Sequence, residues 1–323
     1  MDPVCHTLVG AALGQAGLRR SSRYGMAVLL IGANAPDIDV LSYAWGGLAA
    51  LEFRRGLTHG PLGLAILPLC LIAALWVYHR LRFRTNDSGP PPAWGRLLSM
   101  GYLAILTHPV LDWCNTYGMR WLMPFSHRWW YGDALFIVDP WVWAILSAGI
   151  FLSRAKSNTV PWWRMPATWA LCLFGAYAAA MAGLSRLARE SSLEVAKLSL
   201  AESPSRVMAA PVPLNPFRRL VVLETGEQYR FGTFDLLRRP SFALENYEVE
   251  KNAEHPLAQL AKNTPQGRAF LSWARFPFYV LRSDPPAVYI VDARYTVDPD
   301  AGFGSVAIPL PGPPTARGAQ PSP

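Results

Sequence analysis

The chain has 323 residues, of which 51% are hydrophobic and only 16% are charged, whereas ordinary soluble domains have roughly 25% charged residues. Lys and Arg outnumber Asp and Glu by 30 to 22, but no run of basic residues interleaved with aromatic ones occurs, which argues against a nucleic-acid-binding surface. The four cysteines have no CxxC spacing, so the sequence indicates neither disulfides nor a cysteine zinc site.

Two short apolar segments, 7–18 and 25–36, come first in the chain. We expect a hairpin of half-length helices rather than a cleavable signal peptide, because Asp2 stands where a signal peptide would have basic residues. Four longer apolar segments follow, at 61–79, 97–111, 134–153 and 166–187. A bilayer core needs about 20 apolar residues per helix, so these four predict membrane helices, of which the second is short enough to be tilted or only partly inserted.

Charged residues alternate between the connections of these segments. Ten basic residues and one acid lie in the connections 18–24, 80–96 and 154–164. Seven acids and four basic residues lie in the alternate stretches 1–6, 34–60 and 112–133 and at Asp139. Because Arg-rich connections of membrane proteins stay in the cytoplasm, the alternation predicts a multi-pass protein of a bacterial inner (plasma) membrane with its acid-rich stretches on the extracytoplasmic side.

Beyond residue 188 the chain has mixed charge and shorter apolar runs. Strands are predicted at 218–224, 227–234, 276–283 and 286–294. Turn residues within and between these runs predict two hairpins, and 254–274 is predicted to be helical. We therefore expect a membrane helical domain over 1–187, a soluble α+β domain over 188–308 on the same side as the acid-rich stretches, and a disordered Pro/Gly-rich tail over 309–323.

The predicted fold class is thus mainly α, a polytopic membrane helical bundle with a small C-terminal α+β extramembrane domain. We expect the helical bundle to be surrounded by the lipid bilayer. No nucleic-acid partner is expected. A protein partner that binds 188–308 is an open alternative.

His108 and Asp112 lie at the end of the segment "LTHPVLDWCNTYG". They are four residues apart, so on a helix they project from one face and can bind one ion together. If this pair stands alone, the alternative interpretation is a histidine beside a solvated aspartate at a helix end, without a metal ion.

Further ligand types lie at other ends of the apolar segments. Asp37 and Asp39 follow Pro36 and are two residues apart. If the backbone there is extended, both carboxylates point to the same side of the chain. His6 and His59 lie near the starts of two apolar segments, on the side assigned outward by the charges. An unpaired carboxylate near lipid is costly, so a divalent cation is the natural partner for these residues. Imidazole and carboxylate ligands without thiolate suit Zn²⁺, with Mn²⁺ or Fe²⁺ as alternatives.

An ordered series of motifs covers residues 1–140: MDPVCH, PDID, RGLTH, HPVLD followed by NTYG, and later PFS, GD and FIVDP. Together they resemble the YdjM-type membrane-bound metal-dependent hydrolases, a family thought to be akin to the zinc-dependent phospholipase C and single-strand nuclease superfamily. The resemblance implies hydrolysis of a phosphoester, which includes a lipid as substrate, through a water activated by the metal.

The resemblance also implies residue roles. Carried over position by position, the metal ligands are His6, Asp39, His59, His108 and Asp112. Asp37 is either a ligand or a support for one, and Asp37 or Asp133 would accept the proton of the attacking water. No clear second histidine–acid pair with the spacing of His108 and Asp112 follows in the sequence, so we expect one or two metal ions.

Basic residues among these acids have two interpretations. Arg55 and Arg128 are candidates to clamp a phosphate by bidentate hydrogen bonds, and the alternative is an ion pair with Asp37 or Asp133. His127 is a further, weaker candidate for contact with the metal.

Two other function classes remain open on the sequence alone. A non-catalytic metal-binding membrane scaffold or regulatory protein would need the same ligands. A transporter would also place carboxylates within a membrane. Against this class, the predicted ligands all lie at one end of the membrane helices and not along a path through them.

Overall fold

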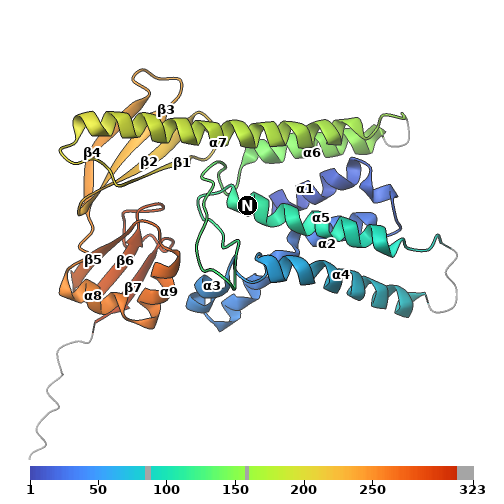
Figure 1. Ribbon diagram of the computed structural model, residues 1–323, viewed down its shortest axis with the longest axis horizontal. Coiled ribbons are helices and arrows are strands. Elements are labelled where there is room, and N and C mark those ends of the chain that lie inside the picture. Colours follow the sequence, from blue (N-terminus) through green and yellow to red (C-terminus); the bar gives the residue numbers. More distant parts are fainter. Residues whose placement is uncertain (84–88, 157–159, 311–323) are drawn as a thin grey trace, which may run out of the picture. The chain divides into compact units, whose positions relative to one another are not determined.

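The computed structural model describes residues 1–83, 89–156 and 160–310, and the chain divides into two compact units (Figure 1). The helical unit comprises Met1–Ser192, Met208–Val221 and Thr233–Ala243. The C-terminal unit comprises Leu193–Val207, Leu244–Pro323 and the segment 222–232 between them. About half of the chain is helical.

The helices that come before the first strand fall into short and long ones. The short helices are α1 (Pro3–Gln15), η1 (Leu18–Arg20), α2 (Gly25–Asn34), η2 (Ala35–Trp45) and α3 (Gly47–Phe53). The long helices are α4 (Pro61–Arg82), α5 (Trp94–Trp113), α6 (Pro140–Lys156) and α7 (Met165–Ser199). The predicted hairpin of short helices before residue 36 is therefore present as α1 and α2.

The short helices pack closely because glycines line their contact. A Cβ atom at Gly10 of α1 would lie 2.6 Å from the carbonyl oxygen of Leu29 on α2, so only glycine allows this approach. Helix α2 packs in turn against α5, α5 against α4, and α1 against α6. The core between α1, α5 and α6 contains Cys5, Val9, Leu111 and Leu146.

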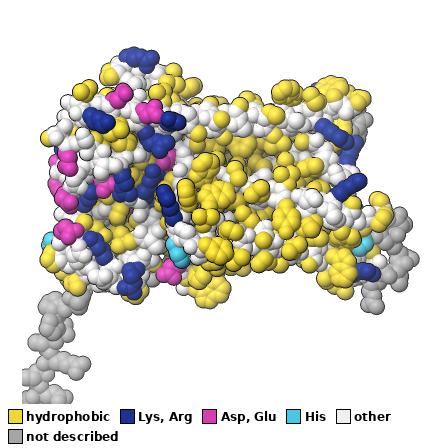
Figure 2. All heavy atoms as spheres, in the orientation of Figure 1, with side chains coloured by type: hydrophobic (Ala, Val, Ile, Leu, Met, Phe, Trp, Pro, Cys, Tyr) yellow, Lys and Arg dark blue, Asp and Glu magenta, His cyan; other side chains and the backbone are white. Residues whose placement is uncertain are grey.

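Three helical stretches are long and apolar enough to cross a membrane within the part of the chain that is described: Gly25–Trp45, Pro61–Arg82 and Met165–Ser199. Two of the predicted spans, 61–79 and 166–187, lie in the second and third stretches. The segments 97–111 and 134–153 form α5 and α6, which do not meet the same criteria. Figure 2 shows a broad hydrophobic surface over the helical unit on the face that is drawn.

Helix α6 is shorter than the apolar run that predicts it because a carboxylate fixes its start. Asp139 Oδ1 accepts hydrogen bonds from the amides of Trp141 and Val142, and Pro140 occupies the first helical position. Both features define a helix N-terminus. Residues 134–138 are consequently outside the helix, and α6 has only 17 residues.

The described residues of the three Arg-rich connections meet at one end of the helical unit. The amide of Ala93 donates to Ser22 Oγ over 3.0 Å, and the Arg20 guanidinium lies 4.3 Å from the ring centre of Trp163. Basic side chains are visible in Figure 2 at the end where α6 and α7 are joined. The alternation of charge along the sequence thus corresponds to contacts in space, whereas the cytoplasmic assignment of this end stays a prediction.

Two sheets follow the helices. One has the order β1-β2-β3-β4, formed by Arg206–Pro211, Arg218–Thr225, Gln228–Asp235 and Phe242–Glu250. The other is antiparallel, with the order β5-β6-β7, formed by Pro277–Ser283, Pro286–Asp292 and Ser305–Pro309. The four predicted strands are β2, β3, β5 and β6, and both predicted hairpins are present.

The sequence missed β1, β4 and β7, and the predicted helix 254–274 is two helices, α8 (Pro256–Lys262) and α9 (Pro265–Trp273). Thr264 caps α9 by accepting a hydrogen bond from the amide of Gly267, and Pro265 follows the cap. The predicted tail from 309 begins two residues too early, because Pro309 ends β7 and the amide of Leu310 donates to the carbonyl oxygen of Pro286. The rest of that prediction, 311–323, lies outside the described residues.

A buried histidine and aspartate cluster

The candidate ligands lie at the end of the helices opposite to the Arg-rich connections. His6 lies in the first turns of α1, and His59 lies just before α4. His108 and Asp112 lie in the last turns of α5. Asp37 follows the end of α2. Helices that alternate in direction bring these distant positions to the same end.

Four of these residues form a compact group. One ligand atom from each of Asp37, His59, His108 and Asp112 lies within 4.8 Å of all the others. His59, His108 and Asp112 are buried, and the Asp37 side chain is 20% exposed. We call these four residues the ligand group.

A backbone hydrogen bond fixes the orientation of His108. Its Nδ1 donates to the carbonyl oxygen of Ala33 over 2.7 Å, because a carbonyl oxygen can only accept. The remaining nitrogen, Nε2, faces Asp37 Oδ1 and Asp112 Oδ2, both at 3.7 Å. In metal-binding histidines, the ring nitrogen that does not bind the metal typically donates its N–H to such a carbonyl or carboxylate oxygen.

Asp39 supports His59 rather than joining the ligand group. Asp39 Oδ2 lies 3.4 Å from His59 Nδ1, while His59 Nε2 lies 3.4 Å from Asp112 Oδ2. The two carboxylates would point to the same side only on an extended backbone, and this condition is not met because Ala35–Trp45 is a 3₁₀ helix. With three residues per turn, carboxylates two positions apart diverge, so Asp37 reaches His108 and Asp39 reaches His59.

His6 adjoins the ligand group without belonging to it. Its ring stacks on His108 with 3.7 Å between ring centres, and its Nε2 lies 3.3 Å from Asp112 Oδ1. Burial lowers the pKa of His6 to about 3. The imidazole is therefore neutral at neutral pH, which is the form that binds a metal.

Asp112 is the residue on which the other side chains converge. Arg55 Nε lies 2.9 Å from Asp112 Oδ2 in an ion pair, and both side chains are almost completely buried. The α-amino group of Met1 also donates to Asp112 Oδ1. Burial raises the pKa of Asp112, but the charge of Arg55, followed by that of the amino group, holds it well below its usual range. Asp112 is therefore an anion.

The donor atoms of this region fit a divalent cation. Several are buried and have no hydrogen-bond partner, which is unusual in a folded protein. They are both ring nitrogens of His6, Nε2 of His59 and His108, Oδ2 of Asp112 and Oδ1 of Asp39. Imidazole nitrogens and carboxylate oxygens together form a ligand set that suits Zn²⁺.

Arg55 does not occupy the position predicted for a phosphate clamp. It is only 3% exposed, and its backbone has a φ of 50°, which turns the side chain into the protein. Its guanidinium donates to Asn115 Oδ1 and the carbonyl of Gly118, in addition to its ion pair with Asp112. The alternative prediction was an ion pair with Asp37 or Asp133, and the structure shows an ion pair with Asp112.

Arg54 is the basic residue that the sequence interpretation missed. Its Nε lies 3.3 Å from Asp39 Oδ1, and its Nη2 lies 3.4 Å from Asp37 Oδ1. The side chain is 21% exposed, so Arg54 lies at the open edge of the ligand group. Its position beside Arg55 was the only available signal, since Arg55 belongs to the RGLTH motif and Arg54 only precedes it.

Three other predicted residues lie apart from the ligand group. Arg128 and His127 are exposed, and Arg128 stacks on Trp130. Asp133 is buried, and its backbone carbonyl accepts a hydrogen bond from Ser185 Oγ. None of these three belongs to the group of ligand atoms found among the described residues.

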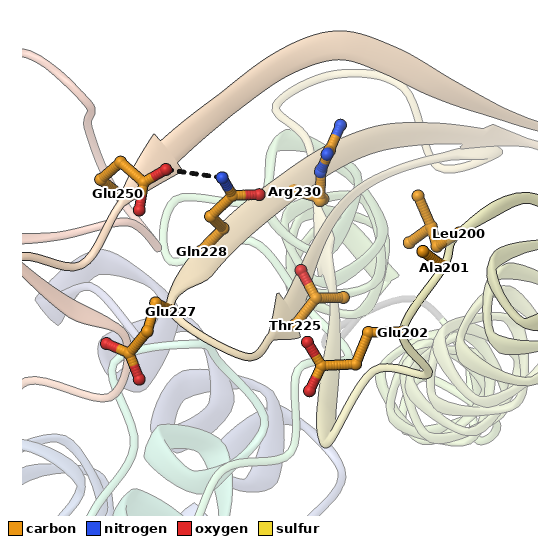
Figure 3. A pocket seen from close by; sticks show the side chains of 8 residues that line it. All are labelled: Leu200, Ala201, Glu202, Thr225, Glu227, Gln228, Arg230 and Glu250. Atoms are coloured by element: carbon orange, nitrogen blue, oxygen red, sulfur yellow. Dashed lines mark hydrogen bonds between the residues drawn. The ribbon is translucent and has the colours of Figure 1, made fainter.

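The C-terminal unit has a separate open pocket of about 330 Å³ (Figure 3). Three glutamates line it, Glu202, Glu227 and Glu250, together with Arg230 and Gln228. The Gln228 amide donates to Glu250 over 2.6 Å. The carboxylates drawn in Figure 3 do not point toward one position, so the pocket is acidic without being a built cation site.

Comparison with known proteins identifies a relationship over the helical part. The family model described as YdjM inner membrane protein matches residues 1–186, which is more than half of the chain and includes the whole ligand group. No curated protein and no solved structure matches the chain.

Proposed function

Because the chain belongs to the YdjM inner membrane protein family, we propose that it is a membrane-bound metal-dependent hydrolase that acts on a phosphoester. The observation that carries this proposal is the convergence of four ligand atoms, from Asp37, His59, His108 and Asp112, within 4.8 Å of one another. Three separate parts of the sequence supply them, so their meeting is not a consequence of local sequence.

The ligand group would hold the cation, with His6 beside it for a second ion. A divalent cation supplies Lewis-acid activation of water and stabilises negative charge on a phosphoryl group. Asp39 holds the ring of His59 through Nδ1. Ala33 holds the ring of His108 through its carbonyl oxygen. These contacts fix both rings in advance of binding.

The exposed edge of the group is where a substrate would enter. Asp37 is the member of the group that reaches solvent, so its carboxylate would accept the proton of an attacking water. Arg54 lies against Asp37 and is itself partly exposed. Its guanidinium would bind the anionic oxygens of a phosphoryl group, the task that the sequence assigned to Arg55.

Apolar residues around this edge favour a lipid phosphoester. Ile38, Leu41 and Trp45 belong to the same 3₁₀ helix as Asp37, and their side chains are 53%, 60% and 76% exposed. They also belong to the candidate membrane span Gly25–Trp45, which would place the edge of the ligand group beside lipid. A molecule with acyl chains would cover these side chains while presenting its phosphate to Arg54.

A non-catalytic metal site is the alternative. The nearly complete burial of His59, His108 and Asp112 favours it, because structural metal sites are closed whereas catalytic ones keep an open position. In that case the cation would only hold α4 and α5 together.

The first test measures metal content and hydrolysis on the detergent-purified full-length protein. Elemental analysis should find at least one transition metal per chain. Hydrolysis of soluble phosphoesters and phospholipids should fall at least about a hundredfold in Asp37→Asn, the usual order of a general-base contribution. The matched control is Glu52→Gln, which changes an exposed acid of the same acid-rich stretch and should remain near wild type.

Each other result has a definite meaning. Absence of metal in wild type even after supplementation would remove both the hydrolase and the structural-site proposals. Metal without hydrolysis of any phosphoester would leave the structural site. Equal rates in wild type and Asp37→Asn would mean that a contaminant hydrolyses the substrate. For the substrate contact, Arg54→Gln should raise KM while leaving the metal content unchanged.

A further inference from the structure

A cluster of arginines surrounds one buried indole at the end of the helical unit opposite to the ligand group. The guanidinium carbons of Arg19, Arg20 and Arg164 lie 5.0, 4.3 and 5.3 Å from the ring centre of Trp163. Trp163 is only 4% exposed. We call these four residues the Arg–Trp cluster.

Two separate parts of the chain build this cluster. Arg19 and Arg20 belong to η1, which follows α1, and Arg164 directly precedes α7. Gly17 has a φ of 126°, and a Cβ atom there would lie 3.0 Å from Cδ of Arg164. The glycine thus lets the Arg164 side chain lie over the turn between α1 and η1.

The charges of two arginines in the cluster, Arg19 and Arg164, lack a compensating carboxylate in the part of the chain that the structure describes. Burial, and then the charges of Arg20 and Arg154, lower the pKa of the Arg19 guanidinium. Arg19 Nε is buried without a hydrogen-bond partner. Converging like charges and an unused buried donor are both relieved by a bound anion.

Exposed apolar side chains place the cluster beside the bilayer. Trp162, Met165 and Trp169 are 50%, 46% and 65% exposed. The candidate membrane span Met165–Ser199 begins one residue after Arg164. Arginines and tryptophans at the end of a span lie at the level of the lipid headgroups.

From this arrangement we propose that the Arg–Trp cluster is a binding site for the phosphate of an anionic phospholipid. The guanidinium groups of Arg19 and Arg164 donate to the phosphate oxygens, with Trp163 as the floor beneath them. The acyl chains lie along the exposed apolar side chains at the start of α7. Basic pockets between membrane helices bind anionic headgroups by the same chemistry.

The site is independent of the proposed hydrolysis, because it lies at the other end of the helices and includes no member of the ligand group. Its role is to hold the ends of α1 and α7 together in a membrane that contains anionic lipid.

The test titrates the detergent-purified full-length protein with phosphatidylglycerol, phosphatidylcholine or inorganic phosphate and counts bound molecules by native mass spectrometry. Wild type should bind phosphatidylglycerol more tightly than phosphatidylcholine. The double variant Arg19→Gln/Arg164→Gln should bind phosphatidylglycerol about 30-fold more weakly, from roughly 1 kcal/mol for each basic residue. The variant Arg19→Lys/Arg164→Lys, which keeps both charges, should recover part of the affinity.

The matched control is Arg80→Gln/Arg82→Gln, which removes two charges from the last turn of α4. These arginines lie over two different aromatic rings, those of Trp76 and Phe83. Because they do not converge on one ring as the cluster does, the control should stay within about threefold of wild type.

Three results would overturn the proposal. They are equal binding of phosphatidylglycerol and phosphatidylcholine by wild type, equal losses in the cluster variant and the control, and binding of inorganic phosphate as tight as that of the lipid. The first comparison needs no variant, so it holds even if the double variant does not fold.

Discussion

Asp112 shows most clearly how a single side chain depends on its surroundings. His6, His59 and His108 lie within 3.7 Å of its carboxylate, and Arg55 pairs with it. Burial of such an anion is tolerated only because the guanidinium compensates it. The carboxylate is therefore both a candidate metal ligand and the counter-ion of a buried arginine.

Asp112→Asn should lower the free energy of unfolding by about 3–5 kcal/mol, because it leaves Arg55 charged and buried without its counter-ion. The measurement is denaturant unfolding in detergent with a chelator present, so that any metal contribution is absent. The control is Arg186→Gln, which breaks an exposed pair with Glu190 and should have no measurable effect. Equal effects of the two variants would contradict the structural role of the buried pair.

Residue spacing predicted part of the site. The i, i+4 relation of His108 and Asp112 is local, so the sequence sufficed to place both on one face of α5. The roles of Asp37 and Asp39 depended on whether their backbone was extended or helical, and Pro36 is compatible with either. The difference between Arg54 and Arg55 depends on the left-handed turn at Arg55, which its sequence neighbours do not specify.

At the scale of elements, close approach of helices determines the position of the ligand group. Helix α2 carries Ala33, the carbonyl partner of His108, and Asp37 lies just beyond its end. The separation of α1 and α2 at Gly10 thus also sets the distance between His6 and the ligand group.

Gly10→Ala should lower the free energy of unfolding by about 1–3 kcal/mol, the usual effect of overpacking, because the new methyl group would meet the backbone of Leu29. The control is Gly175→Ala in α7, where a Cβ atom would meet nothing within 4 Å. That substitution should stabilise the helix by about 0.5–1 kcal/mol. Denaturant unfolding in detergent measures both, and equal effects would show that α1 and α2 can separate freely.

An ion cluster in the C-terminal unit predicts a pH dependence. Glu224 on β2 pairs with Arg206 and with Lys251, the latter at 2.8 Å. Burial raises the pKa of Glu224, but these two cations lower it below its ordinary value of 4.5. A lowered pKa gives stability that is present above pH 4.5 and is lost as the pH falls through the folded pKa.

Glu224→Gln should therefore unfold at a lower temperature than wild type at pH 7, and this difference should diminish below pH 4.5. Thermal unfolding followed by circular dichroism, from pH 7 to pH 3.5, measures it. Glu245→Gln, which changes another glutamate in the same sheet, is the control. A difference between wild type and Glu224→Gln that is independent of pH would contradict the assignment.

The predicted elements were reliable where pattern and length agreed. The apolar runs of α4 and α7 and the hairpins β2–β3 and β5–β6 have local signals that do not depend on tertiary contacts. Strand β4 has the burial pattern of an exposed edge, with mostly polar side chains, so it lacks the alternation that reveals a strand. The start of α6 depended on the cap at Asp139, which lies within an apolar run.

At the scale of the whole molecule, the alternation of basic and acidic connections is the main topological signal. Contacts bring the described basic connections to one end of the helical unit, and the ligand group lies at the other end. The positive-inside rule then predicts that the ligand group and the chain beyond α7 face the extracytoplasmic side.

A reporter fused after residue 323 tests this prediction. Alkaline phosphatase, which is active only outside the cytoplasm, should be active in the fusion, and a fluorescent protein that matures only inside should be dark. The opposite pair of results would reverse the assigned sides while leaving the structure of the ligand group unchanged.

The ligand group draws its members from α5, from η2 and from the turn before α4. During synthesis, a nascent chain that has emerged only as far as α4 lacks two of the four donors. It cannot capture a cation until α5 has been made and has settled against its neighbours. If the ligand group holds a cation, its occupancy would report that the chain as far as α5 is in place, and a shorter nascent chain could not withdraw a scarce ion from its surroundings.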